Sequence, residues 1–349
     1  MKALLRILVL LALALIALFY VDHTDDKNEP LKGPTKPVPN TEVPQLSGDV
    51  MERPKEGWST YVGKKIATFQ KELGEPQRKG PSAYGFTWWV YNQEDEYILV
   101  GVEKGKINQL FVTGEKIDLA PFKLGQTIDE LYRNTITDTE INVTVDNNIY
   151  TMILSEIDLQ TRLLVMYKDV LAQLYFDGET KKLTAIRFID GETLVKQKPY
   201  DMTYVGEVLE PKKPSSFDME KINNENAQQL FELSNIYRQL NGLPVFEIDP
   251  RLSVVTQEQV EGIVMERIAK SDAPETELES LLKNNDIPFE KTSENLAEEY
   301  ADAAEAVSGF MNSESHRKDL LNEDFNKLGT GAFETNFAQI FIKQKEDVE

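Results

Sequence analysis

The pattern of hydrophobic and polar positions changes four times along this 349-residue chain. An unbroken apolar run at residues 7–21 is followed by a polar, proline-containing stretch at residues 22–57. Short helix-like and strand-like patterns then alternate through residues 58–200. A second proline-containing stretch, residues 201–217, leads into a mainly helical pattern at residues 218–349. We therefore predict an N-terminal targeting segment and two folded domains, each preceded by a linker.

The apolar run at the N-terminus has the layout of a secretory signal. Lys2 and Arg6 precede it, and acidic residues begin at Asp22 directly after it. Bulky residues at positions 18–21 stand where a signal peptidase requires small ones, so we favour an uncleaved signal-anchor over residues 1–21. The charges orient the anchor with the globular part outside. We expect a single-pass protein of the cell membrane; a cleaved signal peptide and secretion are the alternative.

The stretch at residues 22–57 contains six prolines among charged and small residues. Such a composition buries too little apolar surface to fold, so we predict a semi-extended tether. Residues 201–217, with Pro211 and Pro214, are predicted to be a second linker.

The domain predicted at residues 58–200 contains an internal repeat. A short helix begins near Val62-Gly63, and a similar start recurs 62 residues later at Leu124-Gly125. The predicted strands cover residues 86–91, 97–102, 107–112, 143–145, 150–154, 162–167, 171–176 and 183–189. We interpret this as a helix against a small antiparallel sheet, twice, with a binding or spacing role. Trp88 and Trp89 point to opposite faces of their strand, so at most one can be core in a one-sided sheet. We expect core burial within this domain rather than an exposed docking surface.

The C-terminal pattern is helical and ends in a hairpin. Apolar residues recur at helical spacing from Ile222 to Leu240, and a second helix follows Asp249-Pro250. Further helices are predicted at residues 277–284 and 301–311, the latter opened by a capping-box arrangement at Asp302. Residues 332–342 form the closing hairpin.

Charge and cysteine usage narrow the possible functions. The net charge is −21, and residues 218–349 hold 28 acidic against 12 basic residues. Nucleic acid and anionic headgroups would repel such a domain. The absence of cysteine excludes disulfides, thiolate catalysis and cysteine-ligated zinc, and in an exported protein it fits a bacterial surface.

Several ordered motifs resemble the CAP superfamily, named for cysteine-rich secretory proteins, antigen 5 and pathogenesis-related proteins. The motifs are Asn235-Ile236-Tyr237-Arg238, Ser293-Glu294-Asn295-Leu296-Ala297, residues 310–321, Leu328-Gly329-Thr330-Gly331 and Phe337-Ala338-Gln339-Ile340-Phe341. The match is to the bacterial, cysteine-free branch. The preceding domain is similar to the CAP-associated N-terminal domain of Gram-positive spore-formers. The resemblance implies an α-β-α sandwich in an exported, membrane-attached protein, and the whole chain is predicted to be α+β.

The same resemblance bears on metal binding. In metal-binding relatives two histidines and two glutamates line a central groove, and only Glu294 carries over. The first histidine has no counterpart at residues 269–274, the second glutamate falls near Ser313 or Glu314, and the second histidine falls near Phe337. We therefore expect no cofactor and no strong zinc site. A hard cation such as calcium, held by Glu294, Glu314 and backbone oxygens, is a minor alternative.

The candidate groove is built from the motif residues. We predict groove or binding roles for Glu294, Asn295, Ser313, Glu314, His316, Arg317 and Gln339. In the favoured interpretation Ser313 caps a helix, and His316 hydrogen-bonds Glu294 as a structural lock. Asn295 and Arg317 would tie loops to the sheet. The rival interpretation makes Glu294 and His316 the acid–base pair of an envelope hydrolase.

We thus predict a membrane-tethered, extracytoplasmic protein that binds a partner in the bacterial cell envelope without catalysis. The partner would be a protein, peptide or lipid, and not nucleic acid. An envelope hydrolase and a lipid-binding protein are the alternatives.

Overall fold

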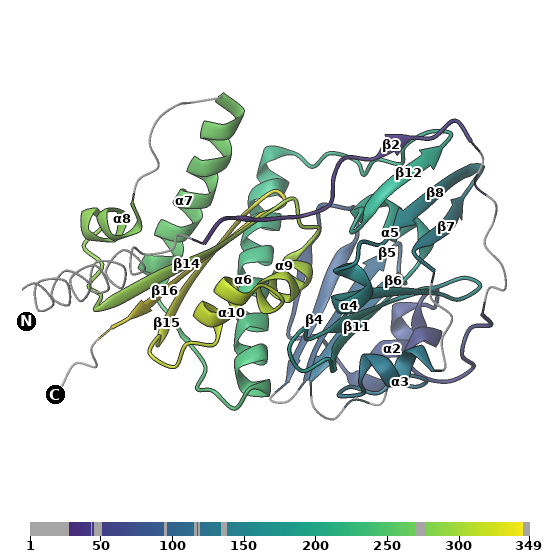
Figure 1. Ribbon diagram of the computed structural model, residues 1–349, viewed down its shortest axis with the longest axis horizontal. Coiled ribbons are helices and arrows are strands. Elements are labelled where there is room, and N and C mark those ends of the chain that lie inside the picture. Colours follow the sequence, from purple (N-terminus) through teal and green to yellow (C-terminus); the bar gives the residue numbers. More distant parts are fainter. Residues whose placement is uncertain are drawn as a thin grey trace, which may run out of the picture.

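The computed structural model describes residues 28–42, 44, 51–93, 96–114, 117, 119–133, 138–269 and 277–344. Two mixed helix-and-sheet bodies lie side by side (Figure 1), so the predicted α+β class is confirmed. Within these residues no helix has the length and apolar character needed to cross a bilayer. The predicted signal-anchor at residues 1–21 lies outside the described part of the chain.

The N-terminal domain is built on one antiparallel sheet of seven strands in the order β3-β4-β5-β6-β11-β10-β9. The strands are β3 (Arg78–Pro81), β4 (Thr87–Gln93), β5 (Glu96–Glu103), β6 (Lys106–Gly114), β9 (Arg162–Met166), β10 (Leu171–Phe176) and β11 (Leu183–Ile189). The helical elements are η1 (Trp58–Tyr61), α2 (Ile66–Leu73), α3 (Ile128–Tyr132), α4 (Asp158–Thr161) and α5 (Gly191–Gln197).

The two repeats expected from the sequence share this sheet. The N–H of Gly63, before α2, donates to Ile107 at the start of β6 (2.7 Å). In the same way the N–H of Gly125, before α3, donates to Leu183 at the start of β11 (2.8 Å). Strands β6 and β11 are antiparallel neighbours. The expectation of two separate small sheets is therefore wrong, because the halves join edge to edge.

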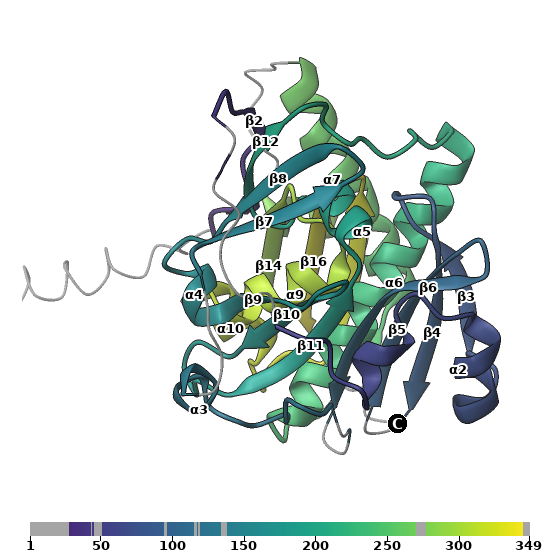
Figure 2. The ribbon, with the colours of Figure 1, turned by 90° about the vertical axis from the view of Figure 1, so that its right-hand side faces the viewer.

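A second sheet of the N-terminal domain has the order β2-β12-β8-β7. Its strands are β2 (Val38–Pro39), β7 (Glu140–Val145), β8 (Asn148–Ile153) and β12 (Asp201–Val205), and Figure 2 shows them together. Residues 201–205 were expected to be linker, and this is wrong. Met202 is buried and the strand pairs with β8 over its whole length, so the domain extends to Val205.

Both faces of the seven-stranded sheet are covered. Ile98 and Val100 pack on one face against the rest of the N-terminal domain. Leu99, whose side chain points the other way, packs against the C-terminal domain. Trp88 is 1% exposed and belongs to the cluster that packs against the C-terminal domain. Trp89 packs against the cluster on the other face, and the Lys79 ammonium lies 3.7 Å from the centre of the Trp89 ring. The sequence predicted burial of one tryptophan in the core of the N-terminal domain; Trp88 is instead buried in a cluster shared with the C-terminal domain, on a second covered face that was not predicted.

The C-terminal domain is a three-layer α-β-α sandwich, as expected. Its sheet has the order β1-β14-β16-β15-β13, with α7 and α8 packed on one face and α6, α9 and α10 on the other. The elements are β1 (Leu31–Lys32), α6 (Ser216–Leu240), β13 (Glu247–Ile248), α7 (Pro250–Ala269), α8 (Leu278–Asn284), β14 (Lys291–Glu298), α9 (Ala303–Met311), α10 (Glu314–Leu320), β15 (Lys327–Phe333) and β16 (Asn336–Lys343).

Residues 28–40, which we call the N-terminal strap, lie against both domains. Strand β1 adds to the edge of β14 and β2 adds to the edge of β12, both in parallel (Figure 1). This part of the chain was expected to be an unattached tether. The prediction is wrong for the strap because prolines exclude a segment from the middle of a sheet but not from its edge.

Candidate functional site

The Ser-Glu-Asn-Leu-Ala motif lies in the middle of β14, where successive side chains point to opposite faces. Glu294 pairs with Ile340 and shares its face of the sheet, where Gln259 of α7 donates Nε2–H to the Glu294 carboxylate (2.7 Å). Asn295 points to the other face and donates Nδ2–H to the main-chain oxygen of His316 (3.0 Å). The strand thus separates two neighbours that the sequence suggested would share a groove.

Asn295 belongs to a buried chain of amides. Its Nδ2 also donates to Oε1 of Gln339 on β16 (3.2 Å), and Gln339 donates to the hydroxyl of Ser234 on α6 (2.6 Å). All three side chains are fully buried. Buried polar groups that satisfy one another fix the positions of the elements that carry them. The predicted groove residues Asn295 and Gln339 therefore join α6, β16, β14 and α10.

His316 is a buried residue of α10, 2% exposed, whose ring stacks on Phe310 with centres 5.5 Å apart. Its Nδ1 pairs with the hydroxyls of Ser313 (2.8 Å) and Ser315 (3.3 Å). Burial lowers its pKa to about 4, although the nearby main chain of Glu29 favours the protonated form. Nε2 has no hydrogen-bond partner among the described residues. The imidazole is therefore neutral at physiological pH.

The expected contact between Glu294 and His316 is wrong. Among the described residues no hydrogen bond joins the two side chains, because Glu294 faces α7 whereas α10 covers the opposite face of the sheet. The two side chains are kept apart because successive side chains along β14 point to opposite faces of the sheet. Both the structural lock and the acid–base pair depended on that contact, so neither is formed.

The remaining candidates at the start of α10 have local roles. Ser313 occupies the cap position, but its hydroxyl goes to the imidazole of His316 rather than to the helix backbone. Glu314 is exposed in the first turn of α10, across the sheet from Glu294. Within the described residues no group of three or more metal-ligating side chains gathers at one point. Glu294 faces α7 and Glu314 lies on α10 at the other side of the sheet, so these two carboxylates do not meet at one cation.

Arg317 binds the N-terminal domain. Its guanidinium lies 2.7 Å from Asp177 and 3.2 Å from Glu179, both in the turn between β10 and β11. Burial acts to raise the pKa of Asp177, but the N–H of Thr180 and the guanidinium of Arg317 outweigh burial and lower it. Asn312, also before α10, accepts from the N–H of Gly178 in the same turn (2.7 Å). A residue expected to secure loops within its own domain thus connects two domains.

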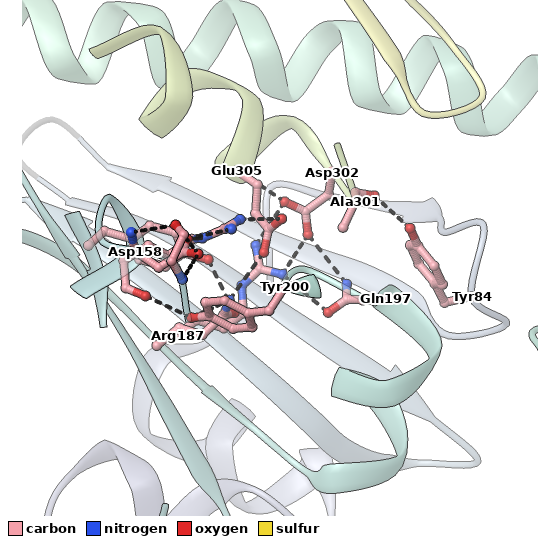
Figure 3. Close-up of polar contacts among 12 residues, drawn as sticks. Tyr84, Asp158, Arg187, Gln197, Tyr200, Ala301, Asp302 and Glu305 are labelled. Carbon is pink, nitrogen blue, oxygen red and sulfur yellow. Dashed lines mark hydrogen bonds and ion pairs between the residues drawn. The ribbon is translucent and has the colours of Figure 1, made fainter. Parts of the chain in front are cut away.

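A second interdomain contact surrounds the start of α9 (Figure 3). Arg187 of β11 is fully buried and makes two parallel hydrogen bonds to Asp302, at 2.7 and 2.8 Å. Asp302 also caps α9 by accepting from the N–H of Glu305 (3.1 Å). Gln197 and the hydroxyl of Tyr84, which donates to the main chain of Ala301 (3.0 Å), complete this side of the contact. A bidentate arginine–carboxylate pair fixes orientation as well as distance.

Glu305 extends the same contact. Its buried carboxylate accepts from Nε2 of Gln173 (3.2 Å) and lies 3.4 Å from Arg162. Burial raises the pKa of Glu305, while Arg162 and Arg187 oppose the rise. The sequence suggested a capping box for Asp302 and Glu305, but the Glu305 side chain is directed to the other domain instead. Arg162, Arg187, Asp302 and Glu305 therefore form a polar layer between the domains, in which all but the partly exposed Arg162 are buried.

The N-terminal strap reaches the motif residues at its first residue. Asn28 donates Nδ2–H to Asp319 (2.7 Å), Asn295 (3.3 Å) and the main-chain oxygen of Glu294 (3.4 Å). The hydroxyl of Ser293 donates to the same Asp319 carboxylate (2.6 Å). Burial raises the pKa of Asp319, and the hydrogen bonds from Ser293 and Asn28 oppose this. The site at this edge of the sheet is therefore occupied by a segment of the same chain.

Further along the strap the contacts are those of a β-ladder. Leu31 and Lys32 stand opposite Ala297 and Glu298, and the N–H of Gly33 donates to the oxygen of Glu298 (2.7 Å). Parallel addition of a strand to an exposed sheet edge is a recurring mode of peptide recognition.

Comparison with known proteins agrees with this architecture. Residues 231–339 match the cysteine-rich secretory protein family, and residues 62–200 match the CAP-associated N-terminal family. Over 303 residues the chain is 36% identical to the uncharacterized membrane protein YlbC of Bacillus subtilis, covering 85% of this chain and 87% of that protein. The chain belongs to the cysteine-rich secretory protein family. The resemblance inferred from the motifs is thereby confirmed.

Two solved structures of family members have the same fold. One is an extracellular protein containing an SCP domain from Bacillus anthracis, with a TM-score of 0.76 and 31% identity over 86% of this chain and all of that one. The other is a cysteine-rich secretory protein from Staphylococcus aureus, with a TM-score of 0.78 and 27% identity over 91% of this chain and 99% of that one. Each match spans both domains, so the two-domain arrangement is shared with these relatives.

Sequence reasoning missed Asn28, Asp319 and Gln259. Asp319 lies in a quoted motif, at a spacing of three from His316 that places both on one side of α10. That spacing was a usable signal. No comparable signal marks Asn28, whose partners are more than 260 residues away.

Proposed function

We propose that this family member is a membrane-associated, extracytoplasmic binding module of the bacterial cell envelope, and that it acts without catalysis. The location is supported by the apolar run near the N-terminus and by relatives named as a membrane protein and an extracellular protein. The acidic C-terminal domain disfavours nucleic acid and anionic lipid as partners.

One observation carries the proposal: the edge of β14 holds an extended segment, whereas the candidate acid and base lie on opposite faces of the sheet. An acid–base pair must reach a common reacting atom. A buried neutral imidazole and a carboxylate on the far side of a strand do not meet that condition. An extended segment bound by side-chain and main-chain contacts is what a binding function requires.

A polypeptide partner is favoured over a lipid. A lipid carrier needs a largely apolar cavity. Two hollows among the described residues lie on the N-terminal domain, with volumes of about 510 and 390 Å³. Both mix apolar with charged lining, as at Asp129 and Lys181 in the larger one. The edge of β14, in contrast, offers main-chain partners and the carboxylate of Asp319.

The test is cross-linking of the full chain in envelope fractions, followed by recovery of the partner. We expect Asp319→Ala to lower recovery at least about tenfold, because it removes the acceptor at the sheet edge; this corresponds to about 1.4 kcal/mol. The exposed Asp324 of the same domain provides the matched control, Asp324→Ala. The double variant Glu294→Gln/His316→Phe should bind like the wild type.

The opposite result is equally clear. Envelope material that is degraded by the wild type, and spared by Glu294→Gln/His316→Phe, would show a hydrolase and overturn the proposal. Equal partner recovery by Asp319→Ala and Asp324→Ala would remove the edge of β14 from the binding function.

A further inference from the structure

We infer that the N-terminal strap is a built-in ligand, and that the site beneath it takes an extended peptide with a carboxamide side chain at its first position and glycine at its sixth. This rests on the proposed binding function and deepens it. The strap then regulates the site by occupying it until a peptide of the same chemistry replaces it.

The first position is recognised through the carboxamide of Asn28. Its Nδ2 is directed at three acceptors at once: the Asp319 carboxylate, the Asn295 side-chain oxygen and the main-chain oxygen of Glu294. Asn295 is fully buried and held by Gln339, so its oxygen is fixed in place. A carboxylate in place of the carboxamide would bring two negative groups together at Asp319. The site therefore disfavours an acidic side chain and takes a side-chain donor such as a carboxamide.

The sixth position is recognised by shape. A Cβ atom on Gly33 would fall well inside van der Waals contact with the carbonyl oxygen of Glu299. The obstacle is backbone, which does not move aside as a flexible side chain would. Between the two ends, Leu31 and Lys32 supply ladder contacts that depend little on side-chain identity.

The strap has the properties of an exchangeable occupant. Each of its two strands is only two residues long, and Val38 in the second is 55% exposed. Short ladders of this kind at the edge of a sheet are among the first parts of a fold to open locally.

Attachment to the same chain explains why a weakly held segment fills the site. Ten residues, 41–50, separate the strap from Met51. Such a connection keeps a tethered segment at an effective concentration on the order of millimolar. Four prolines within the strap favour an extended backbone and so reduce the entropy lost on docking.

The test uses the purified full chain in detergent and a fluorescent synthetic peptide of residues 28–40, read by anisotropy. Wild type should bind micromolar peptide weakly, because its own strap competes. Gly33→Ala and Asn28→Ala, made in the protein, should release the strap and tighten peptide binding at least about tenfold. Gly262→Ala is the matched control, since a Cβ atom there meets nothing within 4 Å. A peptide carrying alanine for Gly33 should bind none of these proteins.

Hydrogen exchange of the strap amides accompanies the binding assay and shows whether the strap is released. Faster exchange in Gly33→Ala with tight peptide binding supports the inference. Faster exchange without peptide binding, unchanged exchange in both strap variants, or equal peptide affinity for wild type and Gly33→Ala would each overturn it. The proposed function is judged separately, because loss of partner recovery in Asp319→Ala does not depend on exchange of the strap.

Discussion

His316 illustrates how a single buried side chain can hold a structural position and still carry a titratable group. Its neutral ring stacks on Phe310 and pairs with Ser313 and Ser315. Because burial disfavours the charged ring, its pKa of about 4 lies below the ordinary value near 6.5. A group whose folded-state pKa is depressed in this way links the stability of the fold to pH.

For His316 we predict that the protein becomes less stable against unfolding as the pH falls from about 6.5 to about 4. In that window the unfolded chain takes up a proton at this position and the folded chain does not, so the free energy of unfolding falls by up to about 3 kcal/mol. His316→Phe keeps the stacked ring and removes the proton site. Chemical denaturation at several pH values measures the effect.

The difference between wild type and His316→Phe is the informative quantity. Asp319 has a raised pKa and titrates nearby in both proteins, so its contribution cancels in the difference. If that difference is the same at pH 7 and pH 4, the pKa of His316 is not lowered in the folded protein.

Single residues also show where inference from sequence stops. The motif identified Asn295, His316 and Arg317 as important, and each is buried and bonded. The sequence did not identify their partners, which can lie far away along the chain: Asp177 is 140 positions from Arg317. The pairing of Glu294 with His316 failed because the motif was not assigned to a strand, where neighbouring side chains diverge.

Among the elements, helices were easier to predict than edge strands. The long segments with apolar residues at helical spacing became α6 and α7, and the closing hairpin became β15 and β16. Strand β14 is rich in polar residues and was not assigned as a strand. Its stability comes from pairing with β16 and from the layers on either side, which are properties of the assembled sheet.

At the scale of elements, we predict that the close contact between α7 and β15 does not tolerate a side chain larger than that of Gly331. A Cβ atom on Gly331 would lie 2.7 Å from the main-chain oxygen of Thr256 and 2.8 Å from the nitrogen of Gln257, both in α7. Gly331→Ala therefore pushes the helix off the sheet, and we expect a loss of about 1–3 kcal/mol in the free energy of unfolding. Urea denaturation measures this loss.

Gly262→Ala, within α7 itself, is the control for that measurement. A Cβ atom there is unobstructed and the backbone is helical, so the change should stabilise the protein by up to about 1 kcal/mol. Equal effects of Gly331→Ala and Gly262→Ala would contradict the close approach of helix and strand.

The whole molecule is held together by a core that both domains share. Trp88, Phe111 and Tyr175 of the N-terminal sheet pack in one cluster with Leu230 of α6 and Val307 of α9. The sequence predicted two domains joined by a linker at residues 201–217. The sequence did not reveal this interface, because a buried charge such as Arg187 cannot be told from a surface charge until its partner is known.

We therefore expect the two domains to unfold in a single transition. All three tryptophans belong to the N-terminal domain, whereas α6 and α7 dominate the helical signal, so fluorescence and far-UV circular dichroism report different domains. Their transitions should coincide. Arg187→Met leaves the buried carboxylate of Asp302 without its cation and should shift both transitions together, by about 3–5 kcal/mol.

Lys283→Met is the matched control, because it breaks only an exposed pair with Glu279 and should cost less than about 1 kcal/mol. A shift of the fluorescence transition alone in Arg187→Met would show that the domains are thermodynamically independent.

The junction between β6 and β11 has a consequence for the history of the fold. The two strands close equivalent halves and pair antiparallel, which is the relation that two identical subunits adopt about a twofold axis. A single half would expose this edge and associate with its own copy through it. Duplication and fusion turn such an isologous dimer contact, whose strength depends on concentration, into a permanent intramolecular seam.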